Sequence, residues 1–325
     1  MGSGVHCAEV SEIQKKVAMA TIVRGKIVFI LSGALVVELN VSKYVARVQK
    51  YFSPRRRVLT PVSQKPTSLK SIIVATMIAK SEGFRPVNHT PPDSFMGKIK
   101  FYGRMVLDLQ ILTIFRDIKK TIPAFKGNVL DIGCGQSPYK FLLDSTQTKY
   151  FGVDIVDAEK FDYSNSEITP FNGEDIPFEN EKFDGIICTE VLEHVQHYQK
   201  LIDEIHRVMK SGATGIITIP WSARYHYIPY DFFRYTPSSL KTMFSKFSEA
   251  KINNRGTDIA NIGNKVIVLW FRNFLPSQIW KWIFVPVWIA LSPILIAVVL
   301  LAHVSLLFNL GSDEDPLGYT IIVKK

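Results

Sequence analysis

The sequence of 325 residues has only three cysteines and is poor in acidic residues over its first part. Cys7, Cys134 and Cys188 are spaced neither as metal ligands nor as a disulfide framework, so a reducing compartment is expected. Residues 1–126 hold 21 Lys and Arg against 7 Asp and Glu, whereas residues 127–325 hold 18 against 22. A basic first part predicts either a polyanionic neighbour, nucleic acid or anionic lipid, or simply a solvated basic surface.

A third glycine is missing from the stretch Asn128–Ser137. An apolar run ends there in Asp131 and is followed by Gly133 and Gly135, which predicts a buried strand, a tight turn and a helix start. A dinucleotide fingerprint needs another glycine three residues later, where Pro138 stands. A carboxylate followed by two glycines suits a ligand with an ammonium group and a ribose better than one with a pyrophosphate.

From residue 128 onward, strand-like apolar segments alternate with helical patterns, which predicts an α/β fold with a doubly wound sheet. A long helix is expected before them, from Asp93 or Ser94 to about Ile122. Residues 1–93 are expected to form a basic, partly irregular and partly helical extension, with a short helix over 68–80, in front of a domain over residues 94–325. The expected strands are 128–132, 149–154, 184–188, 213–219, 264–271 and 317–323.

The ends of the later strands carry further motifs. Asp154 ends the second strand, about 20 residues past the glycines, where a carboxylate is placed to accept hydrogen bonds from both ribose hydroxyls. Three further segments carry these motifs. Segment 173–178 forms the third loop, segment 183–195 contains the fourth strand at 184–188, and segment 208–220 contains the turn into the fifth strand at 213–219. Together with the glycine stretch, these four ordered motifs resemble those of the class I S-adenosylmethionine (SAM) methyltransferases.

The resemblance covers about residues 95–325. It implies a Rossmann-like, seven-stranded, mostly parallel sheet with an antiparallel last strand, and SAM as the cofactor. It also implies that Asp175 takes the adenine amine and that Ile176 packs on the adenine ring. The residues expected to contact the cofactor are Asp131, Gly133, Cys134, Gly135, Asp154, Ile155, Asp175, Ile176, Thr189, Glu190 and His194.

Methyl transfer mainly requires alignment of the reactants, with a base when the acceptor is a hydroxyl. We prefer His226 as that base, because the loops after the fourth and fifth strands usually form the acceptor side. Asp231 is placed to orient it, and Tyr235 or Arg234 to hold an acceptor oxygen. An ordinary hydrogen-bonded loop histidine is the alternative. His194 and His206 are the other candidate bases in this part of the sequence.

Glu190, Glu193 and His194 fall at positions i, i+3 and i+4, so that all three can share one helix face. This spacing can hold a divalent metal, and a similar Glu-x-x-Glu-His carries one in the ubiquinone-biosynthesis O-methyltransferases. The same letters occur in metal-free relatives, where the histidine packs near the methionine end of SAM. We expect no metal here.

The acceptor is narrowed by what is missing after the fourth strand. Neither Asn-Pro-Pro-aromatic nor Pro-Cys stands there, so methylation of DNA amino groups or of cytosine C5 is not expected. A small-molecule, glycan or lipid acceptor is expected instead. The loop 230–237 also resembles methyltransferases encoded with polysaccharide-assembly enzymes. A non-catalytic SAM-fold adaptor and an RNA methyltransferase are the alternatives, although no RNA-binding module is recognisable.

Residues 282–308 contain no Asp, Glu, Lys or Arg, and a bilayer span takes about 20 apolar residues. Because a last strand is expected after this stretch, it must return to the side that it left, as a hairpin interrupted by Pro286 and Pro293 or as two interfacial helices. We expect segment 279–310 to attach the protein to the cytoplasmic side of a membrane, helped by the basic first part. A helix pair that packs on protein in the cytoplasm is the alternative.

Overall fold

The computed structural model describes residues 20–23, 26–31, 35–40, 91–155, 168–227, 229–276 and 279–325. The chain divides into two compact units, residues 1–67 and residues 68–325. In the first unit, β1 (Ala20–Val23), β2 (Lys26–Leu31) and β3 (Leu35–Asn40) form an antiparallel sheet. The helix expected over 68–80 lies outside the described residues, and the domain boundary at residue 93 stays a prediction.

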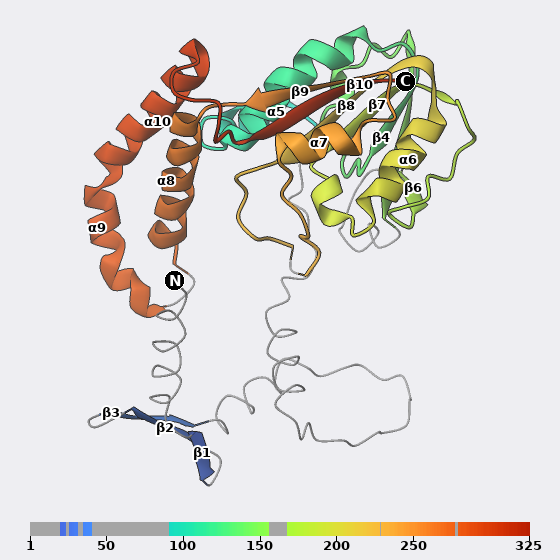
Figure 1. The fold of residues 1–325 in the computed structure, drawn as a ribbon. Helices are drawn as coiled ribbons and strands as arrows, with labels where there is room; N and C mark the ends of the chain where they lie inside the picture. Colours follow the sequence, from blue (N-terminus) through green and yellow to red (C-terminus); the bar gives the residue numbers. More distant parts are fainter. Residues whose placement is uncertain are drawn as a thin grey trace, which may run out of the picture. The chain divides into compact units, whose positions relative to one another are not determined.

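A seven-stranded sheet forms the centre of the second unit, in the order β6-β5-β4-β7-β8-β10-β9 (Figure 1). Only β10 runs antiparallel to its neighbours, β8 and β9. This confirms the predicted sheet with its antiparallel last strand. The strands are β4 (Gly127–Ile132), β5 (Thr148–Ile155), β6 (Ile168–Phe171), β7 (Phe183–Thr189), β8 (Met209–Pro220), β9 (Glu249–Arg255) and β10 (Gly318–Lys324).

Helices surround this sheet and extend beyond it. The α-helices are α4 (Phe95–Arg104), α5 (Leu109–Thr121), α6 (Tyr198–Val208), α7 (Pro237–Met243), α8 (Asp258–Phe274), α9 (Val285–Ala290) and α10 (Ser292–Phe308). Short 3₁₀ turns are η1 (Ile122–Ala124), η2 (Lys140–Leu142), η4 (Leu192–His194) and η5 (Ile279–Phe284).

Both faces of the sheet are buried under helices. Successive residues of a strand point to opposite faces and therefore pack in different core clusters. In β4, Leu130 belongs to the core cluster that contains Leu201 and Ile205 of α6. Its neighbour Val129 belongs to the cluster that contains Ile114 and Ile118 of α5. Two-sided burial explains why the central strands are continuous apolar runs.

The strand expected over 264–271 is wrong, because these residues lie within α8. The sheet position next to β10 is taken instead by β9. The run Val266-Ile267-Val268 has the composition of a strand, but Thr257 caps a helix by accepting a hydrogen bond from Ala260 N–H, and Ile267 packs with residues of α10. Packing against a second apolar helix overrides the strand propensity.

The single long helix expected up to Ile122 is divided into α4 and α5. Asp108 lies between them and caps α5, since its side chain accepts the N–H of Ile111 at 3.2 Å. Arg104 donates to the same carboxylate at 2.9 Å. The acidic residue inside the apolar pattern therefore marks a helix start.

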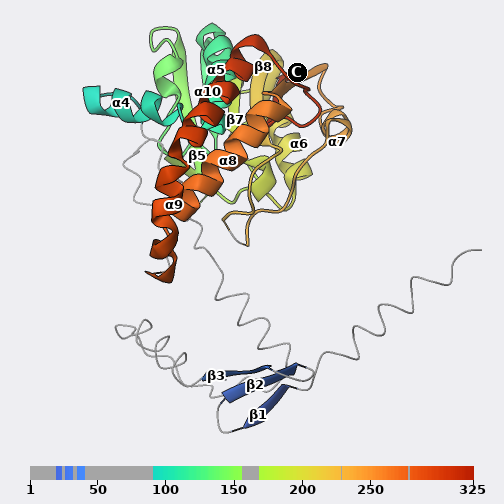
Figure 2. The same cartoon turned by 90° about the vertical axis from the view of Figure 1, so that its left-hand side faces the viewer.

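The apolar segment before β10 folds into helices that pack on α8 (Figure 2). We call residues 258–308, from α8 to α10, the apolar arm. Pro286 and Pro293 lie in the first turns of α9 and α10, where a missing N–H costs no hydrogen bond. No single described helix is long and apolar enough to cross a membrane, but the bent pair Ile279–Ala290 and Ser292–Phe308, with an angle of 63°, passes this test together.

The apolar arm begins and ends at the carboxyl edge of the parallel strands. Arg255 ends β9 immediately before the arm, and Gly318 begins β10 after it. In the register of the sheet, Gly318 lies opposite Arg255 on one side and Pro220, the last residue of β8, on the other. Ligands of open α/β sheets bind at this edge, so the arm is rooted beside the expected site.

The close contact between α8 and α10 at Gly263 can be tested. A Cβ there would lie 2.7 Å from the Cβ of Ala302, so we expect Gly263→Val to push the helices apart and destabilise the arm by about 1–3 kcal/mol. Amide hydrogen exchange in α8 and α10 should become faster. Gly103→Ala is the control, because no atom lies within 4 Å of its new Cβ. Unchanged exchange in Gly263→Val would contradict the packing.

Candidate active site

The turn after β4 holds its two glycines in conformations that other residues rarely adopt. Gly133 and Gly135 have φ angles of +66° and +49°, and a Cβ on Gly133 would collide with the side chain of Val191. The N–H of Gly135 donates to Asp154 Oδ2 at 2.8 Å. This hydrogen bond fixes the turn against the end of β5, so the first two predicted cofactor motifs meet as expected.

Asp154 presents an oriented carboxylate at the end of β5. Its Oδ1 accepts the N–H of Ile155 at 2.8 Å, while Oδ2 accepts that of Gly135. Burial raises the pKa of Asp154, and these two N–H groups partly offset the rise. Each oxygen keeps a further lone pair, which is what recognition of two ribose hydroxyls requires.

Asp131 is a second buried carboxyl group close by. The hydroxyl of Tyr150 lies 2.8 Å from Asp131 Oδ2 and 2.7 Å from Ser137 Oγ. Burial raises the pKa of Asp131 to about 7, against the hydrogen bond from Tyr150, and the charge of Asp154 adds to the rise. A cationic ligand beside Asp131 and Asp154 would favour their ionised forms, so this pair fits a cofactor that carries an ammonium and a sulfonium.

The other expected cofactor residues surround the same edge. Asp175, in the exposed loop after β6, lies 2.7 Å from Lys200 Nζ, and this ion pair lowers its pKa. Ile176 is buried in the core, and Cys134 is a buried thiol whose pKa is raised by burial. Ile155 and Thr189 are half-buried at the ends of β5 and β7.

Glu190 follows β7 in a left-handed conformation with a φ of +53°. Its Oε1 lies 2.7 Å from Nη2 of Arg255, a fully buried arginine that also donates to the carbonyl of Ile219 at 3.0 Å. Arg255 was not among the residues selected from the sequence, because the strand that it ends, β9, was not recognised there. Arg255 therefore holds the carboxylate of Glu190 from the buried side.

Glu193 and His194 lie on η4, directly after Glu190. Burial, followed by the charge of Glu190, raises the pKa of Glu193 well above its ordinary value and so favours the neutral form of its carboxyl. Nδ1 of His194 lies 2.7 Å from the carbonyl oxygen of Tyr230 and donates to it. Burial lowers the pKa of His194 to about 4, so at neutral pH this ring is uncharged.

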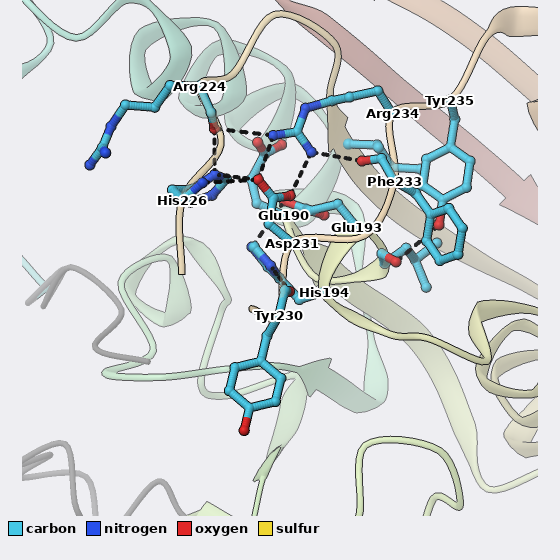
Figure 3. A network of polar contacts seen from close by, with 12 residues as sticks. Glu190, Glu193, His194, Arg224, His226, Tyr230, Asp231, Phe233, Arg234 and Tyr235 are labelled. Atoms are coloured by element: carbon cyan, nitrogen blue, oxygen red, sulfur yellow. Dashed lines mark hydrogen bonds and ion pairs between the residues drawn. The ribbon is translucent and has the colours of Figure 1, made fainter. Parts of the chain in front are cut away.

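The loop after β8 forms the network drawn in Figure 3 around Asp231, a buried carboxylate. Arg234 donates to both of its oxygens, at 2.6 and 2.8 Å. Nδ1 of His226 lies 3.0 Å from Asp231 Oδ2 and 2.8 Å from the carbonyl oxygen of Arg224. Both neighbours are acceptors, so Nδ1 carries the proton and Nε2 is left as the basic nitrogen of the neutral ring.

The structure brings the predicted base next to a predicted cofactor residue. The rings of His194 and His226 are 5.0 Å apart in an edge-to-face arrangement. One potential ligand atom from each histidine and one from Glu193 all lie within 4.8 Å of one another. These atoms have the chemistry of metal ligands, and the expectation that no metal binds stays a prediction.

Tyr235 and His206 lie away from this cluster. Tyr235 is buried, and its hydroxyl donates to the carbonyl of Leu192 at 3.0 Å. In this position Tyr235 anchors the loop to η4 and its hydroxyl is engaged within the protein. His206 packs its ring on Phe247, with centroids 5.1 Å apart. Of the polar residues predicted for the acceptor side, His226, Asp231 and Arg234 are the ones that form a network.

Part of the chain is similar to known proteins. Residues 110–254 match a family model described as a methyltransferase domain. Two uncharacterized proteins of Methanocaldococcus jannaschii are similar: one is 29% identical over 132 residues, covering 39% of this chain and 56% of that protein. The other is 32% identical over 104 residues, covering 31% and 48%. The chain thus spans about half the length of these curated relatives.

Solved structures are similar at a lower level. A SAM-dependent methyltransferase from Archaeoglobus fulgidus is 20% identical, with a TM-score of 0.42 over 71% of this chain and 99% of that one. Phosphoethanolamine N-methyltransferase 2 of Haemonchus contortus, in complex with S-adenosyl-L-methionine, is 17% identical, with a TM-score of 0.40 over 65% of this chain and 51% of that one.

The family match runs from α5 to β9. It contains the glycine turn, the carboxyl groups of Asp131 and Asp154, and the loops after β7 and β8 that hold His194 and His226. These parts meet at one edge of the sheet, and the two buried carboxyl groups fit a cationic nucleoside. Residues 110–254 are therefore similar to a methyltransferase domain, and the two buried carboxyl groups at this edge fit S-adenosylmethionine as the cofactor.

Proposed function

We propose that this protein methylates a hydroxyl group of a lipid-linked, glycan or other membrane-proximal acceptor. One arrangement carries the proposal. His226, with Nδ1 held by Asp231, lies beside the cofactor edge in a loop that is bonded to the apolar arm. The base suits a hydroxyl acceptor, and the arm suits an acceptor at a lipid surface.

The residues of this chain have separate tasks in the proposed reaction. When bound, SAM supplies a methyl group that is activated by its sulfonium. Asp131 holds the ammonium end and Asp154 the ribose. Nε2 of His226 takes the proton of the acceptor hydroxyl, and Asp231 stabilises the imidazolium that forms. Although burial raises the pKa of Asp231, hydrogen bonds from Arg234 and the His226 N–H bring it below its ordinary value, so Asp231 is ionised.

We call the loop between β8 and α7, residues 221–236, the acceptor loop. It is hydrogen-bonded to α8 of the apolar arm and to the segment that follows the arm. Nζ of Lys265, in α8, donates to the carbonyl of Ser222 at 2.6 Å. Nε1 of Trp221 donates to Asp315 Oδ1, in the segment between the arm and β10, at 2.8 Å. These two contacts support an acceptor that enters from the side of the arm.

The apolar arm exposes large side chains that an aqueous surface does not favour. Lys281 Nζ lies 5.5 Å from the ring centroid of Trp280, and such pairs of aromatic and basic side chains suit the headgroup level of a membrane. We therefore propose attachment to the cytoplasmic face of a membrane, without a full crossing. The most exposed side chains include Ile279, Trp280, Ile283, Ile294, Leu307 and Phe308.

Cofactor binding should depend on the ionisation of Asp131. Below its pKa of about 7 this carboxyl is protonated and cannot pair with the ammonium, so SAM affinity should rise from pH 5.5 to 7. Tyr150→Phe removes the hydrogen bond that lowers this pKa. The rise in affinity should then occur at higher pH, and affinity at pH 7 should fall by about fivefold if the pKa of Asp131 increases by about one. Calorimetric titration measures both.

Tyr198→Phe is the matched control for this titration, since it removes a phenol hydroxyl on α6 instead. Its pH profile should follow that of the unchanged protein. A profile of Tyr150→Phe that coincides with both would show that Asp131 does not hold the ammonium.

His226→Ala should separate catalysis from cofactor binding. Loss of the general base is expected to lower turnover by about 10²–10⁴-fold, while SAM affinity stays within about twofold. The measurement is transfer of label from methyl-labelled SAM into a lipid extract of the source organism, with mass analysis of the product. His206→Ala, which changes a histidine on α6, is the control. Unreduced transfer by His226→Ala would remove this residue from the mechanism.

Attachment through the arm is tested by charge. Burial of one large apolar side chain is worth about 1.5–3 kcal/mol, so Ile283→Asp combined with Leu307→Asp should weaken partitioning to vesicles at least about tenfold. Vesicles that contain phosphatidylglycerol are sedimented with the full-length protein. Ser245→Asp together with Thr242→Asp adds the same charge at exposed sites near α7 and should change nothing. Equal sedimentation of both double variants would leave the arm without this role.

A further inference from the structure

A groove of about 450 Å³ lies between α10 and the chain from the end of α4 through α5. We call it the α5 groove. Its apolar wall is formed by Tyr102, Met105, Val106, Leu112 and Phe115, and its lining is completed by Arg116, Lys119 and His303. We propose that the α5 groove binds one anionic phospholipid molecule, with an acyl chain along the apolar wall and the phosphate at Arg116 and Lys119.

The positions of the lining residues on α5 divide the groove into an apolar and a cationic part. Leu112, Phe115, Arg116 and Lys119 follow one another at helical spacing, so they share one face of α5. Asp117 is the acidic residue of this helix, and its Oδ2 accepts the hydroxyl of Thr320 in β10 at 2.7 Å. The cations of the groove are therefore not neutralised from within α5.

Arg116 is held at the edge of the groove. Its Nη1 donates to the carbonyl of Leu306 in α10 at 3.1 Å, which directs the guanidinium along the wall. A guanidinium has five N–H donors, so others are left for a phosphate oxygen. Lys119, one turn further along, is exposed and adds a second charge. Two cations beside an apolar wall match the headgroup and the chain of one lipid.

A hydrogen bond within the protein connects two walls of the groove. Nε2 of His303 lies 2.9 Å from the carbonyl oxygen of Val106, which ties α10 to the segment between α4 and α5. A groove that is already formed loses little conformational freedom when a ligand enters. Its volume also falls within the range of about 300–1,000 Å³ that is usual for small-molecule sites.

A lipid fits this place better than a soluble phosphate compound. Val106, in the groove, is 51% exposed, and α10 continues past His303 with exposed Val304 and Leu307. The apolar wall is therefore continuous with the outer surface of the apolar arm. A soluble phosphate compound would leave this wall in water, whereas an acyl chain would cover it. The site is distinct from the proposed acceptor site, and its occupancy does not depend on methyl transfer.

The test counts lipids on the full-length protein. The protein is prepared in a non-ionic detergent and titrated with dioleoyl phosphatidylglycerol or dioleoyl phosphatidylcholine, and bound lipids are counted by native mass spectrometry. We expect one tightly bound phosphatidylglycerol per chain and at least tenfold weaker binding of phosphatidylcholine. Arg116→Gln with Lys119→Gln should remove this preference. Val106→Asp, which places a carboxylate on the apolar wall, should weaken the binding of both lipids.

Two controls keep the result specific. Lys241→Gln with Lys251→Gln removes two positive charges elsewhere and should bind phosphatidylglycerol as the unchanged protein does. Ile279→Asp with Ile283→Asp, which changes exposed side chains of η5 that do not line the groove, should keep the one tightly bound lipid. Far-UV circular dichroism melting confirms that each variant is folded.

Three outcomes would overturn the proposal. One is equal affinity for the two lipids in the unchanged protein. Another is an unaltered preference in Arg116→Gln with Lys119→Gln. The third is a Val106→Asp variant that binds lipid normally but changes from dimer to monomer in sedimentation, because the groove would then be an interface between two copies of this chain.

Discussion

The ion pair between buried Arg255 and half-buried Glu190 is the constraint on which the carboxyl edge of the sheet depends. Arg255 joins the end of β9 to the loop after β7, and it also donates to the carbonyl of Ile219 in β8. Its own carbonyl accepts the N–H of Leu317, directly before β10. Loss of Glu190 would leave the buried charge of Arg255 uncompensated, typically at a cost of about 3–5 kcal/mol. The strand ends around the site are therefore held together by one guanidinium.

This constraint places three functions at one edge. Asp131 and Asp154, the carboxyl groups proposed to bind the cofactor, lie at the ends of β4 and β5. The loop with His226 leaves β8, and the apolar arm leaves β9. Because neighbouring strands are fixed by the sheet register, the acceptor loop and the arm meet through the contact of Lys265 with Ser222. The proposed cofactor site, the proposed base and an apolar surface are thus neighbours although they are far apart in sequence.

Much of the fold and of the cofactor site could be predicted, because their signals are local. A buried parallel strand is an apolar run, and a carboxylate followed by a glycine turn is visible over the few residues from Asp131 to Gly135. The confirmed strands are of this kind. Strand β6 has only four residues and includes Pro170, so it lacks such a signal. Residues 264–271 gave a misleading one, since β-branched residues there face another helix.

The remainder of the site depends on contacts between distant segments, which no local pattern reports. The importance of Arg255 arises from Glu190, 65 residues earlier in the chain. Tyr235 was predicted from the sequence to hold an acceptor oxygen, but its hydroxyl bonds to the carbonyl of Leu192, 43 residues away. The proton on Nδ1 of His226 likewise follows from two acceptors that the fold brings together. Such assignments require the three-dimensional structure.

The place of β10 in the chain affects how the domain is assembled during synthesis. This strand pairs with both β8 and β9, yet it is made only after the whole apolar arm. Until then the two strands have no partner between them, and the ribosome has already released a long apolar segment. The central sheet is thus completed only after the apolar arm has been synthesised, because β10 follows the arm in the chain. An arm that is inserted in this way cannot be lost as a tail could, because the strand that completes the sheet would be lost with it.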